Sequence, residues 1–81
     1  MALATFELTI SRVDGPLFSG AARSVTLPGA AGELTVYAKH EPLIALLKKG
    51  TITVRADGGS ETIDIERGLL EVSGTGVTVL V

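Results

Sequence analysis

The residues with the greatest capacity for chemistry lie in one stretch of 24 residues, from Leu27 to Gly50. This stretch contains two carboxylates, Glu33 and Glu41, and the only histidine of the chain, His40. Two carboxylates can act as general acid and base when their pKa values are driven apart. The residues around them, however, are glycine and proline turns at strand ends, where binding residues are often displayed. We therefore interpret the stretch as a presented surface and not as an active site.

The partners that a catalytic or metal site requires are missing from the sequence. A serine or threonine nucleophile needs an adjacent base, and His40 is the only histidine available. The sequence has neither a Gly-x-Ser-x-Gly elbow nor a Gly-x-x-x-x-Gly-Lys phosphate loop. Without cysteine, a zinc site is not expected. We expect no catalytic residue, no bound metal and no cofactor.

Several residues of the stretch have competing interpretations. For Glu33 and Glu41, solubility competes with a catalytic pair and is preferred, because nothing nearby predicts a pocket that excludes water. His40 could be a hydrogen-bonded structural residue, an interface residue or a pH sensor, and the first two roles are preferred equally. Gly29 and Gly32 are expected in turns and not in a phosphate cradle.

Composition predicts one small folded domain over residues 1–81. Hydrophobic residues make up 46% and charged residues 20%, which is enough apolar material for one core. The formal net charge is −2 and the basic residues are scattered, so nucleic acid is not an expected partner. Cysteine is absent, which excludes disulfides. No apolar run is long enough for a membrane span, and the amino terminus does not resemble a signal peptide.

Alternation of apolar and polar residues is the dominant pattern, and it predicts half-buried strands. Runs at 51–57 and 62–66 flank an Asp-Gly-Gly-Ser segment and predict a hairpin, as do runs at 69–72 and 77–81. Further strands are expected at 4–10, 22–27 and 33–37, with a bulge or bend at Gly20. About eight to ten short strands predict an all-β fold, an antiparallel β-sandwich or flattened barrel.

The segment from Pro42 to Gly50 does not alternate. Proline at a first helical position, lysines in a last turn and a glycine cap would suit a short helical turn, and an irregular apolar loop is an equal alternative. Its four large apolar residues are expected to be buried, and any that stay outside the core would form an exposed apolar patch, which is typical of a contact site. These residues are Leu43, Ile44, Leu46 and Leu47.

A series of short motifs runs along essentially the whole chain. They are Leu17-Phe18-Ser19-Gly20, Pro28-Gly29, Gly32-Glu33-Leu34, His40-x-Pro42-Leu43, Gly50, Gly68-x-Leu70-Glu71-Val72 and Val77-Thr78-Val79-Leu80. No single motif is diagnostic, but their order and spacing are specific. Together they resemble the epsilon subunit of the bacterial proton-translocating ATP synthase.

The resemblance implies an amino-terminal β-sandwich domain of a non-catalytic rotor subunit. Such a subunit is clasped to the gamma subunit, rests on the ring of c subunits at the cytoplasmic face of the membrane, and couples proton transport to ATP synthesis. The ring-facing glutamate of the family aligns with Glu33, and the loop histidine at the junction of gamma and the ring aligns with His40. These two residues are the partner-binding residues that the resemblance implies.

Two departures from the family pattern concern backbone conformation. The family commonly has glycine where this chain has Thr35 and Lys39, so a positive φ at either position would strain the loop. A third departure is that the sequence stops before the helical hairpin with which family members usually continue. We therefore expect neither ATP binding nor helix-mediated inhibition from these residues, whether the chain is naturally short or an excised domain.

Two other functions compete with the rotor subunit. The first is a free-standing β-sandwich adaptor that binds another protein. The second is a small hydrolase that uses Glu33 or Glu41, which would need a deep pocket holding both carboxylates. Whatever the function, exposed strand edges and the apolar last strand predict self-association of the isolated domain.

Overall fold

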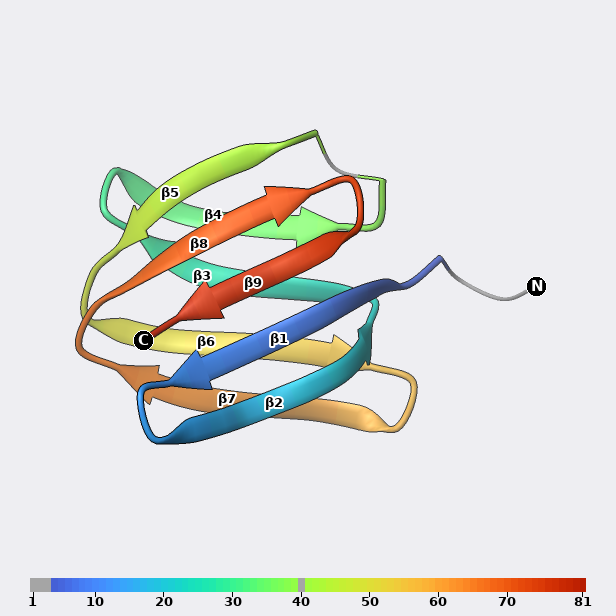
Figure 1. Cartoon of the computed structure of the whole chain (residues 1–81), viewed down its shortest axis with the longest axis horizontal. Coiled ribbons are helices and arrows are strands. Elements are labelled where there is room, and N and C mark those ends of the chain that lie inside the picture. Colours follow the sequence, from blue (N-terminus) through green and yellow to red (C-terminus); the bar gives the residue numbers. More distant parts are fainter. Residues whose placement is uncertain (1–3, 40) are drawn as a thin grey trace.

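The computed structural model describes residues 4–39 and 41–81, and these residues form strands and turns only (Figure 1). The predicted all-β class is confirmed. The nine strands are β1 (Phe6–Arg12), β2 (Gly15–Ala22), β3 (Ser24–Gly29), β4 (Gly32–Tyr37), β5 (Leu43–Leu47), β6 (Gly50–Ala56), β7 (Gly59–Ile65), β8 (Gly68–Ser73) and β9 (Gly76–Leu80).

The strands form two facing layers, as the predicted sandwich requires. One layer has the order β2-β1-β9-β8-β5 and the other has the order β4-β3-β6-β7. A single bridge between Gly29 of β3 and Leu47 of β5 joins the layers into one continuous sheet. The strands pair antiparallel, as predicted, except for β1 and β9, which run parallel. A parallel pair was not visible in the sequence because alternation does not encode strand direction.

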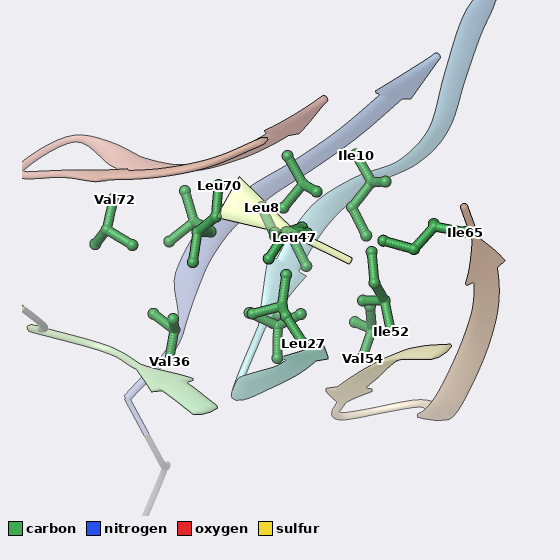
Figure 2. Packing of buried hydrophobic residues seen from close by; sticks show 14 residues of the cluster. Leu8, Ile10, Leu27, Val36, Leu47, Ile52, Val54, Ile65, Leu70 and Val72 are labelled. Carbon is green, nitrogen blue, oxygen red and sulfur yellow. The ribbon is translucent and has the colours of Figure 1, made fainter. Parts of the chain in front are cut away.

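The core lies between the two layers, and every strand contributes one side of its pleat to it (Figure 2). Residues of one parity point inward and their neighbours point to solvent, as alternation predicts. The largest side chains with no measurable exposure come from both layers. They are Leu8, Ile10, Leu27, Ile52 and Leu70.

The two predicted hairpins are present. The β6–β7 turn is Asp57-Gly58 and the β8–β9 turn is Gly74-Thr75. The irregularity that we expected at Gly20 lies elsewhere. Gly20 pairs regularly with Leu8, and the register between β1 and β2 shifts between Ile10 and Ser11, which leaves Leu17 without a partner.

The prediction for Pro42 to Gly50 is wrong, because Leu43–Leu47 is strand β5 and pairs with β8 over its full length. A run of leucine and isoleucine has no strict alternation because both faces of this strand carry apolar side chains. Periodicity therefore could not distinguish it from a helical turn. Pairing with β8 supplies the backbone hydrogen bonds that an irregular loop would lack.

Only one of the two positions at which the family favours glycine has a positive φ. Lys39 has φ = 63°, in the left-handed region that glycine adopts most easily. Thr35 lies within β4 without positive φ, and its hydroxyl is 3.0 Å from the Thr26 hydroxyl on the neighbouring strand. The strain that the sequence suggested is therefore confined to Lys39.

Replacing Lys39 by glycine should stabilise the domain by about 0.5 to 1 kcal/mol, because relief of the left-handed conformation exceeds the added entropy of the unfolded chain. Thr35→Gly is the matched control and should destabilise by about 1 kcal/mol, since it removes a cross-strand contact and loosens a strand. Urea unfolding of both variants measures the two changes. A destabilised Lys39→Gly variant would contradict the strain at this position.

Candidate interaction surface

The outer side of β5 carries large apolar residues that the core does not use. Leu47 enters the core, whereas Ile44 and Leu46 point to solvent and are 69% and 67% exposed. The expectation that some apolar residues of this segment remain outside the core is confirmed. The parity of the strand decides which ones they are.

The register extends this apolar surface across three neighbouring strands. Leu46 lies directly opposite Leu69 of β8, and Leu69 lies opposite Leu80 of β9, so the three side chains form one row on one face. Leu80 is 51% exposed. Ile44 adjoins the row two positions along β5. We call Ile44, Leu46, Leu69 and Leu80 the outer apolar patch.

Large clustered side chains on the solvent face of a small domain are typical of an interaction site. Placing four of them in contact with water is unfavourable, at roughly 25 cal/mol per Å² of apolar surface. The core does not need them, because β5, β8 and β9 already contribute the opposite parity to it through residues such as Leu47, Leu70 and Val79. A partner that covers the patch would remove this cost.

Glu33 is exposed beside the turn that joins β3 to β4. The hairpin is tight at this point because Gly29 pairs with Gly32, which has φ = +142°. A Cβ atom built on Gly29 would lie 2.5 Å from the Gly32 carbonyl oxygen and 2.8 Å from Leu34 Cδ2, so only glycine fits there. Both glycines are thus turn residues, as expected.

The Glu33 hairpin is hydrogen-bonded to the strand that carries the patch. The Ala30 amide donates to the Leu46 carbonyl oxygen over 2.9 Å, and the Lys48 amide donates to the Pro28 carbonyl oxygen over 2.9 Å. Glu33 and the outer apolar patch therefore belong to one connected part of the molecule. The turns at 13–14, 30–31, 48–49 and 66–67 lie together at this end, on the left in Figure 1, which we call the Glu33 end.

The predicted histidine site lies outside the described residues, since His40 falls between the ranges 4–39 and 41–81. Lys39 follows β4 at the end of the sandwich opposite Glu33 (Figure 1). Ala38, in the turn after β4, is five residue steps from Glu33, a distance of about 17 Å at 3.3 Å per step. The Leu27–Gly50 segment therefore spans both ends of the sandwich and is not a single cluster.

This separation also argues against the hydrolase hypothesis. Glu33 and Glu41 are both exposed, and Glu33 lies at the start of β4 whereas Glu41 follows its end, farther apart than paired glycosidase carboxylates. A hollow of about 630 Å³ and a neighbouring one of about 420 Å³ are lined by neither residue. Within the described ranges, no three carboxylate or histidine side chains come close enough to hold a metal ion. No helix of the described residues could cross a membrane.

A curled two-layer sheet with an apolar outer patch and an exposed carboxylate hairpin defines a β-sandwich domain with a candidate interaction surface. Residues 5–81 match the family described as the ATP synthase delta/epsilon chain, β-sandwich domain. The chain belongs to this family, and the resemblance found in the sequence is confirmed.

Individual relatives agree with the family assignment. The chain is 46% identical over 79 residues to a protein from Bordetella petrii and 43% identical over 77 residues to one from Polaromonas naphthalenivorans, both named ATP synthase epsilon chain. These matches cover 96% and 94% of this chain and 56% of each relative, so the chain spans little more than half the length of these relatives.

Two solved assemblies contain a similar fold. A chain of the mitochondrial ATP synthase of Euglena gracilis, in a structure of its OSCP, F1 and c-ring, superposes with a TM-score of 0.87 at 29% identity and covers 95% of this chain and 50% of that one. A chain of the Tetrahymena thermophila mitochondrial ATP synthase, from its central stalk and c-ring, gives 0.80 at 13% identity, covering 99% of this chain and 65% of that one. The second likeness shows the shared fold alone.

Gly29→Ala should destabilise the domain by about 1 to 3 kcal/mol, because its Cβ would overlap the Gly32 carbonyl and force the Glu33 hairpin open. Gly58→Ala is the matched control: nothing lies within 4 Å of its Cβ position, and it should change the free energy of unfolding by less than about 1 kcal/mol. Urea unfolding compares the two. Equal effects of both substitutions would show that the close approach at Gly29 does not hold the hairpin.

Proposed function

We propose that this chain is the β-sandwich part of a central-stalk rotor subunit of a proton-translocating ATP synthase. It would join the gamma subunit to the c-ring and couple proton transport to ATP synthesis without catalytic residues of its own. The match of residues 5–81 to the delta/epsilon β-sandwich family is the observation that carries this proposal. The Euglena likeness, to a chain from an F1 and c-ring assembly, supports it.

The outer apolar patch is the surface that we assign to gamma. A stalk joint that transmits torque needs a stiff scaffold and an interface that does not slide. Strands β5, β8 and β9 supply the scaffold, because each is hydrogen-bonded to a neighbour along its length. Burial of the row Leu46, Leu69 and Leu80 would supply the apolar core of the interface.

We assign the Glu33 end to the c-ring. The turns there carry charged side chains of both signs, among them Glu33, Lys48 and Glu66, and these side chains are exposed. A surface of this kind orients a partner through complementary charges more than it adds affinity. His40 remains our second proposed partner-binding residue. In the complex the domain would lie peripherally at the cytoplasmic face of the membrane.

Leu46→Asp should weaken binding of the matching gamma subunit at least about 10-fold, because it places a charge in the apolar patch, between Ile44 and Leu69. Val13→Asp is the control, since Val13 is an even more exposed apolar residue in the β1–β2 turn, outside the patch. Calorimetric titration of gamma with each variant measures the effect. If the wild-type chain does not bind gamma at micromolar concentration, the free-standing adaptor becomes the better hypothesis.

Glu33→Ala should leave the fold intact and weaken assembly on the c-ring only slightly. The side chain is exposed, and an ion pair between exposed groups contributes about 0 to 1 kcal/mol. Thermal unfolding tests the first part, and co-sedimentation with c-ring vesicles at low and high salt tests the second. A variant that fails to fold would instead assign Glu33 a structural role.

A further inference from the structure

A second site lies at the end of the sandwich opposite Glu33, where the chain passes from β2 to β3 and from β6 to β7. A hollow of about 630 Å³ opens there, within the size range of small-molecule pockets. Its walls are Ala4, Ala56, Gly59 and the Tyr37 ring, and two arginines, Arg23 and Arg55, border it. Neither the proposed gamma contact nor the proposed ring contact uses these residues.

The register of four strands aligns the polar groups of the hollow in one row. Ser24 of β3 lies opposite Tyr37 of β4 on one side and opposite Arg55 of β6 on the other, and Arg55 lies opposite Ser60 of β7. Residues directly opposite each other share one face of a sheet. Three hydroxyl groups and one guanidinium therefore project from the same face, next to apolar walls.

The two arginines differ in their partners. Arg23 forms an ion pair with Asp57 of the β6–β7 turn, and its amide donates to the Arg55 carbonyl oxygen over 2.7 Å. Among the described residues this is the only ion pair, so the Arg55 guanidinium has no carboxylate partner there. Two arginines against one aspartate leave a local charge of about +1 on a chain whose net charge is −2.

We propose that this hollow binds a small amphipathic anion, a molecule with one phosphate or carboxylate group attached to a flat apolar body. The Arg55 guanidinium would take the anionic group in a bidentate arrangement, which suits both phosphate and carboxylate. The Ser24 and Ser60 hydroxyls would donate further hydrogen bonds. The Tyr37 ring and Ala4 would cover the flat body of the ligand, and Ala56 would lie at the edge of the hollow.

The probes are 1-naphthyl phosphate and 1-naphthoate, titrated into the isotope-labelled chain and followed by amide chemical shifts. The hollow predicts saturable shifts at Ser24, Arg55 and Ser60 for at least one of them, and the stronger binder identifies the preferred anionic group. Uncharged 1-naphthol and inorganic phosphate should each bind at least about 10-fold more weakly, because each satisfies only half of the site.

Arg55→Gln should weaken binding of the preferred probe at least about 10-fold, whereas Arg12→Gln, the removal of an arginine at the Glu33 end, should change it less than about twofold. Equal losses of probe affinity in both variants would mean that the probe responds to overall charge and not to Arg55, and would overturn the proposal. Should Arg55→Gln not fold, the shift map of the wild-type chain decides. Shifts that fall on the outer apolar patch, or none up to millimolar probe, would also overturn it.

Discussion

The whole structure depends on one requirement: the side chains at alternate positions of each strand must be buried between the two facing layers. A domain of this size has little surplus stability, and a buried leucine such as Leu70 contributes about 2 to 5 kcal/mol of a total of about 5 to 15 kcal/mol. Each strand must therefore present its apolar parity inward, and the register of every pair is fixed by this requirement. Whatever lies on the other parity is free to serve contacts with other molecules.

The solvent-facing side chains differ between the two layers. On β5, β8 and β9 they include the apolar row Leu46, Leu69 and Leu80. On β4, β3, β6 and β7 they include a row of threonines, Thr35, Thr26, Thr53 and Thr62. One layer can thus bury apolar surface against a partner, and the other is suited to water. The bridge between Gly29 and Leu47 connects the two layers and fixes the Glu33 hairpin beside the apolar row.

Alternation predicted most of the fold, including both hairpins, because it reports directly which side chains the core needs. It failed at β5, because the outward-facing residues Ile44 and Leu46 are apolar and the strand therefore shows no apolar–polar alternation. The remaining members of the patch were predictable only in part. Leu80 is visible in the sequence as an apolar residue out of step with the alternating Val77 and Val79. Leu69 belongs to the patch only because strand register places it opposite Leu80, and sequence spacing does not encode register. The polar row that contains Ser24 and Arg55 also arises from strand register and could not be predicted from sequence spacing.

We propose that the outward face of β5, β8 and β9 meets gamma. Since the chain contains no cysteine, a photoreactive group can be attached to a single introduced cysteine, at Leu46 or, for comparison, at Thr62 on the outward face of the other layer. A gamma contact at the outer apolar patch predicts cross-links to gamma from position 46 and none from position 62. Cross-links from position 62 with none from position 46 would contradict it.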